Sequence, residues 1–175
     1  MDASYVSAFP EAEINRHASL AEQLNEDHLV HVDAIPGNNG RWQVTIVAYD
    51  YLGELSLICG LMFVHGLDIH SGEVFTYETL EKNAQEVDPP PRRRARPRLL
   101  STVTQLPATN LNRRKIVDVF SVQPLNPGAP DWQSYADDLQ ALIKMLHTGQ
   151  RREARSLLAK RVGALFAGLD SSERP

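Results

Sequence analysis

The sequence predicts an α+β fold, with a four-stranded antiparallel sheet and helices packed against one of its faces. Strand-like apolar segments lie at 28–35, 41–49, 68–77 and 114–122. Two segments with helical spacing, 54–65 and 131–147, follow the second and the fourth of these strands. Hydrophobic residues make up 42% of the 175-residue chain, which is enough for the core of one domain with appendages.

Residues 1–27 are expected to form an N-terminal helical segment. Pro10 fits the first turn of a helix over 10–26, and the acidic residues Glu11 and Glu13 favour its N-terminus. Apolar residues at helical spacing predict that this helix lies on something. The strands at 28–35 and 41–49 follow, and the turn-rich sequence PGNNG between them predicts an antiparallel hairpin.

The next segment predicts a strand, a helix and a strand joined by short connections. Asp50 ends the first strand, and Gly53 permits a tight loop before a helix over 54–65. Gly66 suits the left-handed position that often ends a helix. A strand then runs over 68–77.

Residues 79–113 are expected to be a long disordered insertion. Four prolines and five arginines lie between Pro89 and Arg98, and no helical or strand period survives. Such a composition cannot bury enough apolar surface to offset the entropy of ordering the chain.

The C-terminal part predicts a strand, two helices and a tail. A turn joins the strand at 114–122 to a helix over 131–147, for which Asp131 is a suitable N-cap. A basic helix is expected over 149–169, and a disordered tail over 170–175.

The order of these elements contains most of a ferredoxin-like split β-α-β unit within residues 28–148. The strand that normally ends such a unit, after its second helix, is missing. The strand at 28–35 can replace it, because the hairpin places it on the open edge of the strand at 41–49. The sequence therefore predicts a ferredoxin-like sheet with an early strand at one edge.

Four local features of this unit carry a resemblance to a known family. They are a strand ending in Asp50, a loop with Gly53, the step Gly66-Leu67-Asp68-Ile69, and the strand sequence Val117-Asp118-Val119-Phe120. With them, residues 41–78 and 114–146 resemble an ACT domain, a small amino-acid-sensing module. The likeness is greatest to the ACT regions of bacterial PII uridylyltransferases and of glutamine synthetase adenylyltransferase-like proteins, which act in nitrogen signalling. Tyr51-Leu52 stands where Arg-Pro is common, and the insertion splits two strands that the family joins by a tight turn.

The resemblance implies a regulatory module that binds an amino acid, with glutamine favoured, and biases an attached or partner nucleotidyltransferase. In the family the ligand's carboxylate meets a helix N-terminus, where free N–H groups and the helix dipole favour an anion. A dimer interface completes that site, with an aspartate from the neighbouring subunit facing the ligand's ammonium group. The positions that match are Asp50, Leu52, Gly53, Glu54, Leu55, Asp68 and Ile69.

One face of the sheet is expected to be left uncovered. Its apolar side chains are drawn from Val47, Tyr49, Phe75, Tyr77, Val117 and Val119. Such a patch is costly to leave in water. This predicts a homodimer, or burial against another domain such as a nucleotidyltransferase.

Two other functions stay open. The same fold can serve as a dimerisation or protein-interaction module without a ligand. Residues 92–161 carry fourteen basic and five acidic side chains, so an anion or nucleic acid is a second candidate partner. Its contacts would be Arg92, Arg93, Arg94, Arg96 and Arg98. No aromatic residues interleave these arginines, which argues against a stacking platform for single strands, and a solvated loop is the simplest interpretation.

Catalysis is not expected. The sequence has no Gly-Ser followed by Asp-x-Asp to hold the metal ions of a nucleotidyltransferase, no phosphate loop and no nucleophile elbow. We therefore expect no enzyme activity, no cofactor and no metal site. The single cysteine, Cys59, and the lack of a long apolar run predict a cytoplasmic protein without a transmembrane helix.

Overall fold

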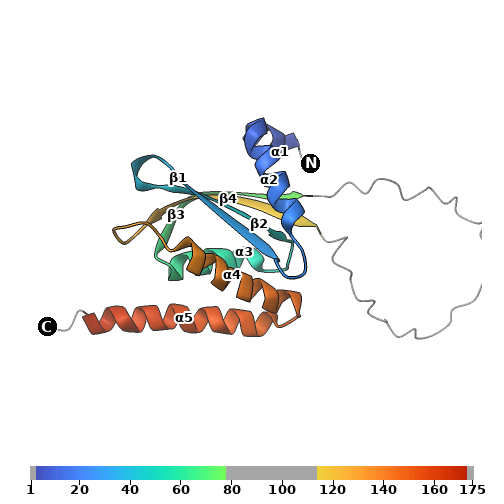
Figure 1. Ribbon diagram of the computed structural model, residues 1–175. Helices are drawn as coiled ribbons and strands as arrows, with labels where there is room; N and C mark the ends of the chain where they lie inside the picture. Colours follow the sequence, from blue (N-terminus) through green and yellow to red (C-terminus); the bar gives the residue numbers. More distant parts are fainter. Residues whose placement is uncertain (1–2, 78–113, 173–175) are drawn as a thin grey trace, which may run out of the picture.

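The computed structural model describes residues 3–77 and 114–172, and Figure 1 shows how they are arranged. The elements, in chain order, are α1 (Ala3–Ala8), α2 (Glu11–Gln23), β1 (Val30–Pro36), the 3-10 turn η1 (Asn38–Gly40), β2 (Trp42–Tyr49), α3 (Glu54–Val64), β3 (Leu67–Tyr77), β4 (Lys115–Pro124), α4 (Trp132–His147) and α5 (Arg151–Ser172). The predicted α+β class and the four-stranded antiparallel sheet are confirmed.

The strands lie in the order β1-β2-β4-β3. The β1–β2 hairpin sets Val30 opposite Ala48 and Pro36 opposite Trp42, so the early strand occupies an edge, as predicted. Asn39 takes a left-handed φ of 59° in the connecting turn, a conformation that asparagine tolerates. β4 pairs antiparallel with both β2 and β3, so these two strands run parallel to each other and α3 connects them.

Helices α3 and α4 lie side by side on one face of the sheet and close the main core (Figure 1). Alternate residues of the central strands point towards them, including the fully buried Val44 and Ile46. The rings of Trp42 on β2 and Trp132 on α4 lie 5.4 Å apart at one end of this layer.

Helix α5 forms a third layer over α3 and α4 (Figure 1). Gly60 of α3 allows a close approach, because a Cβ there would lie 2.6 Å from a methyl group of Leu158. One carboxylate ties the three helices together. Asp138 of α4 accepts a hydrogen bond of 2.8 Å from Arg161 of α5 and lies 3.0 Å from Nε2 of His65, at the end of α3.

Helices α1 and α2 cover part of the opposite face, which corrects one expectation. The Tyr49 hydroxyl donates a hydrogen bond of 3.2 Å to the carbonyl of Leu24, the residue that follows α2. Val47, Tyr49, Val117 and Val119, which were expected to be uncovered, are all buried. The chain's own N-terminal helices thus take the place that the sequence assigned to a second subunit or domain.

An aromatic cluster extends this cover to β3. Phe75 of β3, also expected on the uncovered face, lies half-buried with its ring 5.1 Å from that of Tyr5 and 5.5 Å from that of Phe9. The Tyr5 hydroxyl forms a hydrogen bond of 2.8 Å with Nδ1 of the buried His17. Tyr77, the remaining residue expected on this face, ends β3, and only its backbone is described.

The C-terminal boundary also differs from the expectation. Helix α5 continues to Ser172, so residues 170–172 are helical rather than part of a disordered tail. The predicted insertion at 79–113, which includes the five arginines from Arg92 to Arg98, lies outside the described residues. Within residues 3–77 and 114–172, no helix is long and apolar enough to cross a bilayer.

Candidate functional site

The loop between β2 and α3 is the centre of the predicted ligand site. The Glu54 N–H donates to the Tyr51 carbonyl at 3.0 Å, which closes a four-residue turn. Gly53 occupies its third position with a φ of 90°, in the left-handed region that glycine adopts without strain. Leu52 at the tip is 77% exposed, whereas Tyr51 is buried. The turn thus starts α3 directly after the strand, as the sequence predicted.

Two carboxylates of the predicted site point in different directions. Asp50 lies 3.5 Å from the guanidinium of Arg114 and is partly exposed. Glu54 is only 3% exposed and turns inward, where its Oε2 accepts the Tyr51 N–H at 3.0 Å. Burial raises the pKa of Glu54 to about 8, with smaller contributions from the nearby Asp118 and Asp50 carboxylates. Glu54 therefore stabilises the turn rather than facing a ligand.

A guanidinium from α5 reaches the same turn. A Cβ built on Gly53 would lie 2.9 Å from an Nη atom of Arg155. The missing side chain of Gly53 thus makes room for a cation from the chain's own C-terminal helix. A cation beside a helix N-terminus does not gain from the helix dipole, whereas a bound anion between the two would interact favourably with both.

Beside this turn the surface has a hollow of about 500 Å³. The loop side of the hollow is formed by Tyr51 and Leu52, and the far side by the end of α4 and the start of α5; the remaining lining residues are Leu146, Gly149, Arg151, Arg152 and Glu153. The Tyr51 hydroxyl forms a hydrogen bond of 2.9 Å with Nδ1 of His147, which fixes the loop to α4. Two helix N-termini and two arginines therefore surround or adjoin one concave surface.

The other predicted contacts lie elsewhere within the chain. Asp68 and Ile69 are the second and third residues of β3, beyond the far end of α3, and an eleven-residue helix is about 16 Å long. Asp68 is exposed, with a carboxylate oxygen 3.8 Å from Nε2 of His70. Leu55 is 43% exposed on α3. Within one chain the structure therefore brings the loop residues together and leaves Asp68 and Ile69 apart from them. The expected contact of Asp68 with the ligand of a neighbouring subunit stays a prediction. The predicted contacts Arg92, Arg93, Arg94, Arg96 and Arg98 lie outside the described residues.

Sequence reasoning missed two features near this site. The first is Asp118, which is fully buried under α3 and whose two carboxylate oxygens have no hydrogen-bond partner among the described residues. Its alternation with Ile116 and Phe120 on β4 was a usable signal. The second is the approach of Arg155 to Gly53, for which the sequence holds no local signal.

Comparison with known proteins adds no family to this geometry. No protein-family model matches the chain, and a search of curated proteins finds no relative. Among residues 3–77 and 114–172, no three histidine, cysteine, aspartate or glutamate side chains lie close enough to hold a metal ion. The candidate site is therefore defined by its own residues.

Proposed function

We propose that the chain is a regulatory ACT-like module that binds an amino acid, with glutamine favoured, at the β2–α3 turn. The strand order supports the ferredoxin-like part of this proposal. β4 lies between β2 and β3, α3 connects these two strands, and β1 stands beside β2 where a terminal strand would pair.

The observation that carries the proposal is the hollow beside Tyr51 and Leu52, which is lined by Arg151, Arg152 and Glu153, together with the approach of the Arg155 guanidinium to the adjoining Gly53. The carboxylate of an amino acid would lie between the first N–H groups of α3 and the guanidinium of Arg155, with Arg151 and Arg152 at the rim. Arginine suits this role because its planar donors match a carboxylate. In this arrangement α5, rather than a second subunit, closes the site.

Regulation would follow from the position of α5. A ligand between Gly53 and Arg155 changes the contacts that hold the start of α5 against α3, so it favours one placement of this helix. An attached or partner nucleotidyltransferase that contacts α5 would sense that change. The ligand could shift the equilibrium between the two placements of α5 only by as much as its affinities for them differ.

A thermal-shift screen of the twenty amino acids tests the proposal, with glutamine as the first probe. A ligand at about 100 times its dissociation constant adds roughly 2.7 kcal/mol to the stability of the folded chain. We expect Arg155→Gln to abolish the shift, while Lys160→Gln on the same helix, which is exposed and does not line the hollow, leaves it unchanged. A shift that survives Arg155→Gln would refute this binding mode.

One observation favours a second function, a protein-interaction module without a ligand. The Arg155 guanidinium already lies in the space that a ligand carboxylate would enter beside Gly53. In that case none of the twenty amino acids raises the melting temperature. The exposed apolar side chains of Leu52 and Leu55 would then contact a partner protein.

A further inference from the structure

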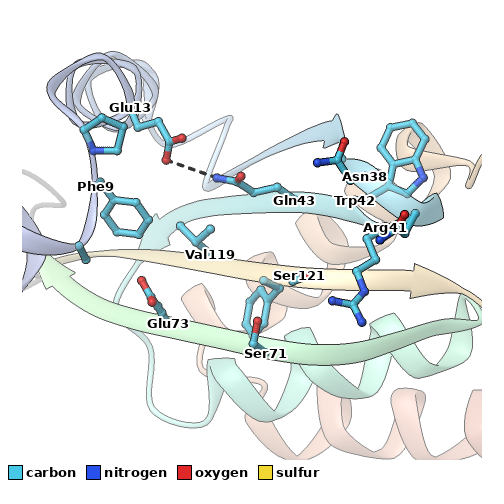
Figure 2. Close-up of a pocket in the computed structure, with 15 residues that line it drawn as sticks. Phe9, Glu13, Asn38, Arg41, Trp42, Gln43, Ser71, Glu73, Val119 and Ser121 are labelled. Carbon is cyan, nitrogen blue, oxygen red and sulfur yellow. Dashed lines mark hydrogen bonds between the residues drawn. The ribbon is translucent and has the colours of Figure 1, made fainter.

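A second hollow of about 500 Å³ lies on the opposite face of the sheet, beyond the part that α1 and α2 cover. Figure 2 shows it between the α1–α2 junction, at Phe9, and the start of β2, at Arg41. Its floor is formed by β4 and β3, with Val119 and Ser121 on the first strand and Ser71 and Glu73 on the second. None of these residues belongs to the β2–α3 site.

Opposite charges line this hollow without neutralising each other. The Arg41 side chain extends from the start of β2 towards Ser71, and the Glu73 carboxylate points towards the α1–α2 junction (Figure 2). In the part of the chain that the structure describes, neither side chain has a salt-bridge partner within 4.0 Å. Within residues 3–77 and 114–172 both charges are therefore without an ion-pair partner, and they stand at separate ends of one cavity.

The polar groups next to Arg41 and Glu73 follow the same division into a positive end and a negative end. The hydroxyls of Ser71 and Ser121, paired across β3 and β4, lie towards the Arg41 end. Glu13 lies at the other end, the one marked by Glu73. A carboxylate oxygen of Glu13 accepts a hydrogen bond of 3.4 Å from the Gln43 side chain. Between the two ends, Val119 provides apolar surface, and Phe9 adds apolar surface beside the Glu73 end.

The spacing of residues along β3 indicates how far apart the two charges of a bound molecule must be. Ser71 and Glu73 lie on the same face of β3, two residues apart, which corresponds to about 7 Å. A single α-amino acid has its two charges closer together than this. A molecule that carries the charges at the ends of a short aliphatic chain would span the hollow and place its methylene groups against the apolar middle.

We propose that this hollow binds a small dipolar molecule, with its carboxylate at Arg41 and the two serine hydroxyls and its ammonium group at Glu73. The ligand class is that of ω-amino acids and of short peptides whose terminal charges are similarly spaced. This site is independent of the proposed function, because it shares no residue with the β2–α3 turn.

The test uses 6-aminohexanoate as the probe in an NMR titration of the full ¹⁵N-labelled chain. Hexanoate and hexylammonium, which each keep one charge, are the matched control ligands. We expect 6-aminohexanoate to shift the backbone amide signals of Gln43, Ser71 and Ser121 and to bind at least tenfold more tightly than either control. Equal binding of hexanoate would overturn the dipolar site, since Arg41 alone would then explain it.

Two conservative variants locate the charges. Arg41→Gln and Glu73→Gln change exposed side chains, so the fold is retained, and each should weaken binding of 6-aminohexanoate at least tenfold. Lys144→Gln and Glu11→Gln, exposed and outside the hollow, should leave it unchanged. Amide shifts confined to Leu52 and Gly53 would show that the probe occupies the other hollow, and would refute the proposal without refuting the amino-acid site.

Discussion

Asp118 is an ionisable residue at a core position, where an apolar side chain is usual. It is 0% exposed, between β4 and the helical layer, and both carboxylate oxygens lack partners among the described residues. Burial raises its pKa from 3.8 to about 7, and the Asp50 carboxylate adds to this effect. The neutral acid is therefore the form that the folded protein accommodates best.

A pH-dependent stability follows from this burial. Because the folded pKa lies above the unfolded one, the folded chain holds its proton more tightly, so the stabilisation is complete below about pH 4 and is lost as the pH rises to about 7. We predict that Asp118→Asn changes little at about pH 3.5 and stabilises the protein at pH 9 by on the order of 2 kcal/mol. Urea unfolding at both pH values measures this. Asp137→Asn, an exposed acid on α4, should show no such difference.

Gly53 combines a backbone requirement with a side-chain contact, and a substitution series separates the two. Gly53→Ala places a Cβ at a φ of 90° and 2.9 Å from Arg155. Gly40→Ala places one at a φ of 74° with open space around it. We predict that Gly40→Ala costs about 1–2 kcal/mol and Gly53→Ala slightly more, as measured by chemical unfolding, because the Cβ at Gly53 must also displace the flexible end of the Arg155 side chain.

The same experiment in an Arg155→Ala background tests the contact. The extra cost of Gly53→Ala should disappear there, while the cost of the left-handed φ should remain. An extra cost that persists would show that Arg155 does not limit the space at Gly53.

At the residue scale, sequence reasoning does not predict contacts between residues that lie far apart along the chain. Local turn chemistry was enough to place Gly53 before a helix, and the alternation on β4 was a signal for the buried Asp118 that sequence reasoning left unused. The contact between Gly53 and Arg155 depends on how α5 folds back over α3. No local pattern at either residue encodes it.

At the scale of the elements, α3 and α5 each contain a glycine, and the two glycines have opposite surroundings. Gly60 of α3 faces Leu158, whereas nothing lies within 4 Å of a Cβ on Gly163 of α5. Both occupy helix interiors, where glycine is unfavourable by about 0.5–1 kcal/mol relative to alanine. Only the first has a packing reason for that cost.

The same substitution at these two sites should therefore have opposite effects. We predict that Gly60→Val destabilises the protein by about 1–3 kcal/mol, because the added methyl groups overlap Leu158 and displace α5. Gly163→Val should be neutral or slightly stabilising. Thermal unfolding gives both values, and equal effects would contradict the close packing of the two helices.

Local sequence patterns predicted where the helices and strands lie along the chain, but not which elements pack against each other. The prediction of a helix over 54–65 agrees with α3 to within one residue, because Gly53 and Gly66 both adopt the left-handed conformations expected at its ends. The apolar stripe of α2 correctly predicted a helix that lies on something. It could not indicate which face of the sheet α2 covers, since that depends on tertiary contacts such as Tyr49 to Leu24.

At the scale of the whole molecule, the N-terminal helices act as an internal partner for the sheet. They bury Val47 and Val117, which are 0% and 1% exposed, and the Lys115 ammonium donates to the Ala21 carbonyl at 2.6 Å. The predicted homodimer thus loses the apolar patch on which it was based.

Removal of residues 1–26 should recreate that patch. We predict that the truncated chain self-associates in sedimentation velocity at concentrations where the full chain shows a single slower species, because the exposed apolar face favours a partner. Val47→Thr and Val117→Thr in the truncated chain should reduce the association. A truncated chain that sediments as a monomer would contradict this role of α1 and α2.

The arrangement of the sheet also affects how the protein is made. β2 ends at Tyr49, but its inner neighbour β4 begins only at Lys115. At about 5–20 residues per second, a ribosome needs roughly 3–13 s to add the segment between them. During this interval the nascent chain holds a two-stranded hairpin, which is marginal in water, with an apolar strand whose second edge has no partner yet. Chaperones that bind extended apolar segments would therefore find their target here, before the central pair of the sheet can form.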